Sequence, residues 1–143
     1  MRSLAAGILL AFGVSVLAGM PLSTPSRAAA AGCVRFVASN FDAPGNDNNN
    51  ENGEWVRIKN VCASGKGIGG WKIHDYNRNH TYTFAAGLRI GARKTVTLYT
   101  GKGSNTRAKR YWGMGSAVWN NTPPEWAYLR NGSGTLMSKW TEY

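Results

Sequence analysis

The stretch FDAPGNDNNNENGEWVRIKN, residues 41–60, decides how the rest of the chain is interpreted. Its first half is a polar run of carboxylates and asparagines with Pro and Gly, and its second half alternates apolar and polar residues. Strict alternation predicts a half-buried strand with Val56 and Ile58 on the buried face. The other face carries one aromatic and two basic residues: Trp55, Arg57 and Lys59. A polar turn that leads into such a strand indicates a β protein.

Similar short runs of β-branched and aromatic residues recur after residue 32, separated by Gly, Asn and Pro. They are CVRFVAS, EWVRIKNV, WKIHDY, TYTF, TVTLYT, AVWN, EWAYLRN and TLMSKWTEY. No helical period extends beyond about two turns, so this spacing predicts an all-β fold, an antiparallel β-sandwich of about eight or nine short strands. We expect Val56, Ile58, Trp71 and Trp119 in its core.

The first 31 residues have a different character. Arg2 is followed by the apolar run LAAGILLAFGVSVLAGM and then by AAAA, which contains an A-x-A cleavage site. This layout predicts a secretory signal peptide over residues 1–31 and a secreted single domain over residues 32–143. Cleavage removes two of the 17 basic residues and none of the seven acidic ones, which leaves 15 − 7 = +8. Such a charge favours polyanionic partners.

The chain has two cysteines, Cys33 and Cys62. Two cysteines in an exported domain most often pair, so we expect a disulfide between them. An alternative stays open at this stage: AAGC, residues 30–33, resembles a lipoprotein site in which Cys33 carries the lipid.

The polar half of the opening stretch offers weak candidates for a calcium site in Asp42, Asp47 and Glu51. The EF-hand spacing fails, because counting from Asp47 places Asn52 at the sixth position and Ile58 at the twelfth, where glycine and glutamate are required. Asparagine and aspartate also form turns through their own backbone. The stretch is therefore expected to be a loop, and no cofactor is predicted, with calcium left open.

A second polar stretch, GKGSNTRAKRYW at residues 101–112, combines cations with aromatic rings. Such a combination can follow a phosphate backbone and stack bases. Candidate polymer-binding residues, together with the outward-facing Trp55, are Lys102, Arg107, Lys109, Arg110 and Trp112. The expected partner is a polyanion or cell-envelope polymer, or a protein, and nucleic acid stays possible. Binding of neutral glycans through Trp55 or Trp112 is the alternative.

Enzymatic function finds little support. G-x-S-x-G and H-E-x-x-H are absent, and a paired cysteine is no nucleophile. The segment HDYNRNH, residues 74–80, is faintly similar to a metal-dependent nuclease signature, but asparagine replaces its acidic residue and its glycine. A small secreted nuclease that uses His80 is the least favoured alternative, and we expect no catalytic residues.

Taken in order, the segments NGEWVRIKN, GIGGWKIHD, TYTFAAGLRIGARKTVTLYTGKG, YWGMGSAVWNN and EWAYLRNGSGTLMSKW resemble the lamin tail domain. The resemblance covers roughly residues 33–143. It implies an immunoglobulin-like sandwich in which Trp71 is a core residue and Asp75 closes the turn after it. Glu125, in TPPEW, stands where bacterial members resemble a glycine-aspartate turn. The implied role is a non-catalytic module for binding or scaffolding.

Overall fold

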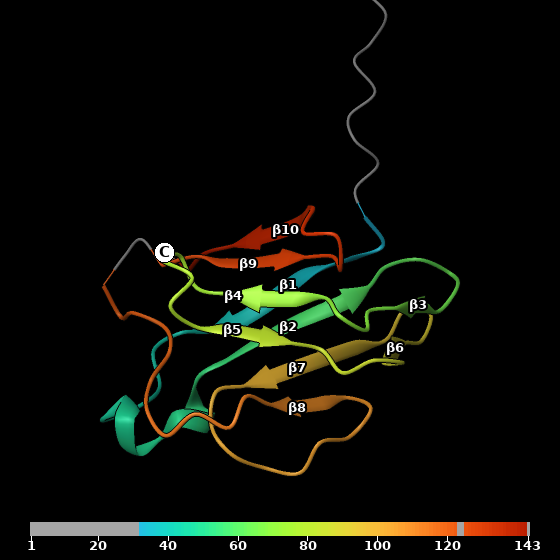
Figure 1. Cartoon of the computed structure of the whole chain (residues 1–143). Coiled ribbons are helices and arrows are strands. Elements are labelled where there is room, and N and C mark those ends of the chain that lie inside the picture. The colour runs from blue at the N-terminus through green and yellow to red at the C-terminus, as the bar shows by residue number, and fades with distance from the viewer. Residues whose placement is uncertain (1–31, 123–124, 143) are drawn as a thin grey trace, which may run out of the picture.

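The computed structural model describes residues 32–122 and 125–142, and the predicted signal peptide lies outside them. Two four-stranded sheets face each other across one core (Figure 1). The first sheet has the order β1 (Val34–Asn40), β2 (Trp55–Asn60), β7 (Thr95–Tyr99) and β8 (Lys109–Tyr111). The second has the order β10 (Leu136–Trp140), β9 (Ala127–Arg130), β4 (Lys72–His74) and β5 (Thr81–Thr83).

Two further strands, β3 (Lys66–Gly67) and β6 (Arg89–Ile90), form a two-residue pairing of their own. The polar stretch before β2 carries two single-turn 3-10 helices, η1 (Asp47–Asn49) and η2 (Glu51–Gly53). The all-β sandwich expected from the sequence is confirmed, with ten short strands in the described part of the chain. Two of the ten are the two-residue strands β3 and β6, which are too short to give a periodic signal in the sequence.

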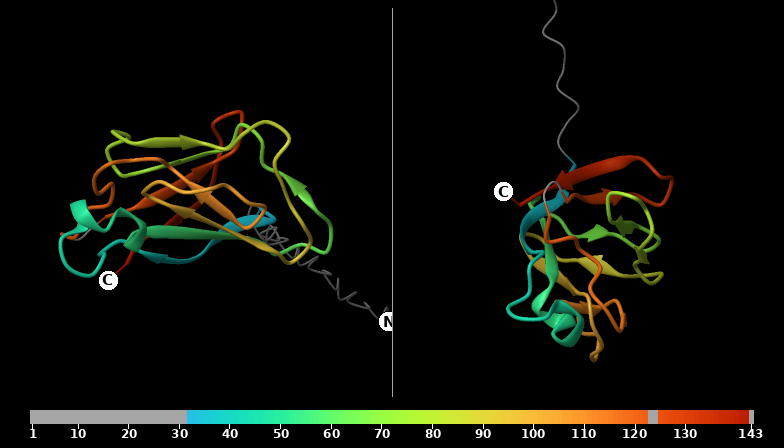
Figure 2. Two further views of the ribbon diagram at one scale, coloured as in Figure 1. Left: turned by 90° about the horizontal axis from the view of Figure 1, so that it is seen from below. Right: turned by 90° about the vertical axis from the view of Figure 1, so that its left-hand side faces the viewer.

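The core lies between the sheets, and β2 shows why. Its side chains alternate, so that Val56 and Ile58 are each 1% exposed while Trp55 and Arg57 are half-buried on the outer face. Trp119 is also buried, whereas Trp71 is only partly buried and packs against the margin of the core. The end-on view in Figure 2 shows the two layers, and β1 lies beside β10 where their edges meet.

The structure corrects two expectations. The segment AVWN, residues 117–120, forms no strand, although Val118 and Trp119 are buried. Conversely, the basic stretch, which contains none of the expected strands, includes the strand β8, which pairs with β7 in the parallel direction. Parallel strands need a connection that crosses from one end of the pair to the other. Residues 100–108 make that connection and return the chain to the start of β8, so that the basic stretch lies along the edge of the sheet.

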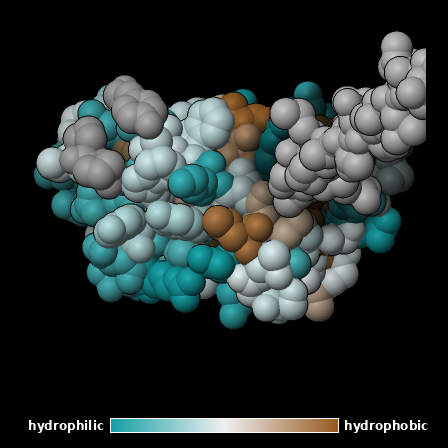
Figure 3. Space-filling model, turned by 90° about the horizontal axis from the view of Figure 1, so that it is seen from above, coloured by the Kyte–Doolittle hydropathy of each residue, from teal (hydrophilic) through white to brown (hydrophobic). Residues whose placement is uncertain are grey.

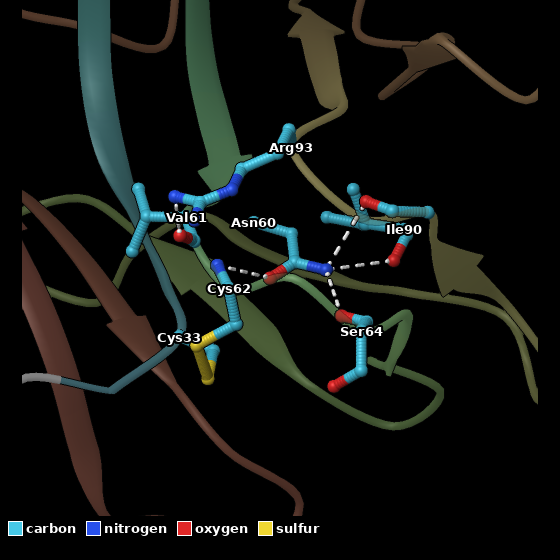
Figure 4. Close-up of a disulfide and its surroundings, with 8 residues drawn as sticks. Cys33, Asn60, Val61, Cys62, Ser64, Ile90 and Arg93 are labelled. Carbon is cyan, nitrogen blue, oxygen red and sulfur yellow. Dashed lines mark hydrogen bonds between the residues drawn. A yellow bond between two sulfur atoms is a disulfide. The ribbon is translucent and has the colours of Figure 1, made fainter.

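The predicted disulfide is confirmed: Cys33, just before β1, is bonded to Cys62, just after β2 (Figure 4). A paired Cys33 excludes the lipoprotein alternative. Next to the disulfide, Asn60 is fully buried, and its amide nitrogen lies within hydrogen-bond distance of three carbonyl oxygens, those of Ser64, Ile90 and Gly91. Its side-chain oxygen accepts from the Cys62 backbone. Asn60 therefore ties the end of β2 to the turn between β6 and β7.

The face seen in Figure 3 is largely hydrophilic, and its apolar residues form small separate patches. Among the described residues, large hydrophobic side chains are exposed only at Tyr76 and Leu136. The same part of the chain contains no helix long and apolar enough to cross a membrane.

Candidate functional site

A cavity of about 940 Å³ opens where the β6–β7 region meets the segment that leads into β8. Its floor is apolar and comes from the turn before β6 and from Ile90. Four basic residues also line it, and no acidic residue does: Arg89, Lys94, Arg107 and Arg110. We call this the basic cavity.

The connection that carries Arg107 is held by its own side chains. The Thr106 hydroxyl accepts hydrogen bonds from the backbone N–H groups of Ala108 and Lys109, and Asn105 accepts one from Tyr111. The backbone N–H of Thr97 in β7 then donates to the Ala108 carbonyl at 2.9 Å. Threonine and asparagine often order loops in this way. These bonds fix the wall of the basic cavity.

Arg110 enters the cavity from β8. It lies opposite Leu98, a buried residue of β7, so its side chain points to the inner side of the sheet. The guanidinium lies near Tyr82 of β5, where burial raises the pKa of the phenol and the charge of Arg110 partly offsets that rise. Arg110 Nε is buried without a hydrogen-bond partner. An unpaired buried donor is costly, and an anionic ligand in the cavity is the kind of group that would satisfy it.

No carboxylate in the described residues neutralises the four cations of the basic cavity. The one ion pair among the described residues joins His80 to Asp75 at 2.9 Å, on another part of the surface. Arg89 donates to the carbonyl of Gly65 at 3.2 Å, but no acid faces it. Arg107 and Arg110 were predicted from the sequence, whereas Arg89 and Lys94 were not. Those two come from a region with no aromatic neighbours, so only the fold brings them to the basic stretch.

The other predicted polymer-binding residues lie elsewhere. Lys102 is exposed on the connection, and its carbonyl accepts from Asn52. Lys109 is exposed on the outer face of β8. Trp55 is half-buried on the same face with the Arg57 guanidinium 4.8 Å from its ring centre. Trp112 packs edge-on against Tyr82 and Trp119 at the margin of the core. No tryptophan in the described residues is exposed, so a flat aromatic platform for neutral sugars gains no support from the structure.

The three weak calcium candidates differ in their burial, and they form no metal-binding group of three in the described part of the chain. Asp42 is exposed and Glu51 is half-buried, whereas Asp47 is buried. The carboxylate near Asp47 is Glu54, the residue just before β2. In the sequence, Glu54 stands out only as the start of the expected strand EWVRIKNV. Glu54 is fully buried, and burial raises its pKa to about 7, with a smaller contribution from the charge of Asp47.

The two histidines have structural partners. His80 Nδ1 contacts Asp75 Oδ2, and Asp75 also accepts from the His80 backbone, so it closes the β4–β5 turn as the resemblance implied. Glu125 reaches the same region and accepts from the backbone of Tyr76 at 3.2 Å and of Trp126 at 2.8 Å. The described residues contain no cluster of three or more His, Cys, Asp or Glu arranged for a metal.

Fold and topology define an immunoglobulin-like β-sandwich module. The family model for the Lamin Tail Domain matches residues 27–143, and the chain belongs to this family, which is non-enzymatic. The match begins inside the segment predicted to be a signal peptide, so the boundary at residue 32 stays a prediction. A comparison with curated proteins found no match.

Proposed function

We propose that this lamin tail domain is an exported, non-catalytic binding module that holds an anionic polymer of the cell surface in the basic cavity. One observation carries the proposal: four cationic side chains line a single cavity that no carboxylate neutralises. Cations that are concentrated in a concave site raise the local concentration of anionic ligands and speed their association. The buried, unpaired Arg110 Nε adds a directional donor.

Two further features support export and a binding role. The predicted signal peptide and the Cys33–Cys62 disulfide both suit an oxidising, extracellular setting. The family is non-enzymatic, and the predicted nuclease residue His80 is engaged by Asp75, which agrees with a binding role.

Salt dependence of binding tests the proposal. Affinity for inorganic polyphosphate, duplex DNA, isolated cell walls and a neutral glucan is measured by titration at low and high salt. We expect the polyanions and walls to bind and salt to weaken them steeply. The double variant Lys94→Ala/Arg107→Ala should bind about tenfold less tightly, and its slope of log K against log salt should shrink by about 2.

Lys72→Ala is the matched control, because Lys72 is an exposed strand lysine of the other sheet. It should leave both affinity and slope nearly unchanged. An equal loss per removed charge in both variants would assign the binding to net charge alone and contradict a specific cavity. Salt-insensitive binding to the glucan would favour the half-buried aromatic residues instead. Preferential binding to DNA over walls would change the partner but keep the site.

A further inference from the structure

Two buried carboxylates lie at the end of the sandwich where η1 and η2 lead into β2. Asp47 begins η1 and is 9% exposed, and Glu54 follows η2 and is 0% exposed. Buried charges are normally paired or bound to metal, because removing them from water is costly. In the described part of the chain, no Lys, Arg or His forms an ion pair with either carboxylate.

Each carboxylate uses one oxygen and leaves the other free. Glu54 Oε2 accepts from the backbone N–H of Val118 at 3.0 Å, and Asp47 Oδ2 accepts from the Asn121 amide. Asp47 Oδ1 and Glu54 Oε1 are buried and have no hydrogen-bond partner. The two groups lie close enough for the charge of Asp47 to raise the pKa of Glu54, although burial is the larger cause.

A third oxygen, from outside the acidic stretch, faces the same place. Thr100 follows β7 and is 1% exposed, and its backbone N–H donates to the Glu54 carbonyl at 3.1 Å. Its hydroxyl acts on the Glu54 carboxyl and lowers the pKa of that group, yet Thr100 Oγ1 has no well-aligned partner of its own. Three buried, unsatisfied oxygens therefore lie around the Glu54 carboxyl, two from the polar stretch and one from the end of β7.

We propose that Asp47 Oδ1, Glu54 Oε1 and Thr100 Oγ1 are ligands of a calcium ion. All three are hard oxygen donors, and no nitrogen or sulfur ligand joins them, which disfavours zinc. Calcium accepts six to eight oxygens in irregular geometry, so backbone carbonyls and water can complete the shell, whereas magnesium requires a near-ideal octahedron. The ion would neutralise both buried carboxylates at once.

The site would also join segments that are distant in sequence. Asn48, in η1, accepts from the backbone of Ala117, and Glu54 accepts from Val118, so the polar stretch already contacts the irregular segment at residues 117–121. A calcium ion between Asp47, Glu54 and Thr100 would fasten this contact to the end of β7. Extracellular modules commonly bind calcium with dissociation constants of about 0.1–1 mM, which matches the calcium concentration outside cells.

Calcium titration of the chelator-stripped protein tests this proposal independently of polymer binding. In about 10 mM CaCl₂ we expect the Tm to rise by about 5 °C, with saturable binding by calorimetry. Terbium should replace calcium and be sensitised by Trp119, which follows Val118 in the chain. Glu54→Gln and Asp47→Asn should each remove the calcium-dependent rise. Thr100→Val keeps the shape of the side chain and should weaken calcium binding several-fold in a folded protein.

Asp42→Asn is the matched control, since Asp42 is an exposed carboxylate of the same stretch. It should retain the full calcium response. The proposal is overturned if the wild-type Tm does not change with calcium and calorimetry detects no binding, or if Glu54→Gln or Thr100→Val responds to calcium as the wild type does. A calcium-independent gain of stability in Glu54→Gln, with no binding by the wild type, would show that a proton satisfies the cluster instead.

Discussion

His74 shows how a single buried side chain is fixed by its partners. The imidazole is 4% exposed and stacks on Tyr128 with ring centres 5.1 Å apart. Nδ1 lies 2.7 Å from the Asp75 carbonyl, which can only accept, so this nitrogen carries the proton. Nε2 accepts from Arg130 Nε at 3.1 Å and must present its lone pair. The ring is therefore neutral and held in one tautomer.

This arrangement predicts that low pH destabilises the fold. Burial lowers the pKa of His74 from 6.5, and the charges of Arg78 and Arg130 act in the same direction. Below pH 6.5 His74 takes up a proton in the unfolded chain, whereas in the folded chain it stays neutral down to its lowered pKa. The stability that His74 contributes is therefore present above pH 6.5 and is lost as the pH falls through the folded pKa. His74→Gln does not titrate. We expect it to cost about 1–2 kcal/mol at neutral pH from lost hydrogen bonds.

Urea unfolding across the pH range checks this expectation. The difference in free energy of unfolding between wild type and His74→Gln should shrink as the pH falls toward about 5. Both proteins keep His80 and its contact with Asp75, so that contribution cancels. A difference that stays constant with pH would show that His74 does not titrate on unfolding in this range.

At the scale of elements, β8 and the connection before it depend on one close approach. A Cβ at Gly103 would lie 2.4 Å from the ring of Tyr111, which itself stacks on Tyr99 with ring centres 5.2 Å apart. The ring cannot retreat without losing that stack. Gly103→Ala should therefore displace the connection and cost about 1–3 kcal/mol in stability. Because Arg107 lies on the same segment, polyanion affinity should fall as well.

Gly115→Ala is the control for this prediction, since a Cβ there meets nothing within 4 Å. Both glycines lie in irregular segments before or after β8, and neither requires a left-handed backbone. Denaturation and polyphosphate titration of the two variants measure the comparison. Equal stability and affinity in both would mean that the connection adapts and that its position is not set by Tyr111.

Elements with a strong local signal were predictable from the sequence, and those defined by distant partners were not. β2 was found because its alternation is complete over six residues. Residues 117–119 look like a strand because they are apolar, yet the backbone N–H groups of Ala117 and Val118 donate to the side chains of Asn48 and Glu54, 69 and 64 residues away, and not to a neighbouring strand. The site follows the same rule. Arg107 and Arg110 stand out as a local run, while Arg89, Lys94 and Glu54 acquire their roles only through packing.

At the scale of the whole molecule, backbone hydrogen bonds link the end of the sandwich that carries the disulfide to the basic cavity. The Arg93 backbone donates to the Cys62 carbonyl at 3.3 Å, and the Asn60 backbone donates to the Lys94 carbonyl at 3.0 Å. Lys94 lines the cavity, so these two hydrogen bonds connect the wall of the candidate site to the segment that carries the Cys33–Cys62 bond. A link of this kind makes the disulfide relevant to binding as well as to folding.

The double variant Cys33→Ser/Cys62→Ser tests that link. The bond closes a loop across a sequence separation of 29 residues, so its loss should lower the free energy of unfolding by about 3.6 kcal/mol on the chain-entropy estimate. Asn60 keeps its own hydrogen bonds to the β6–β7 turn, so we expect the folded variant to retain the cavity and to lose only about twofold to threefold in polyphosphate affinity. Urea unfolding and titration of the same samples give both numbers. A large loss of affinity in a variant that is still folded would show that the disulfide itself, and not the Asn60 bonds, positions Lys94.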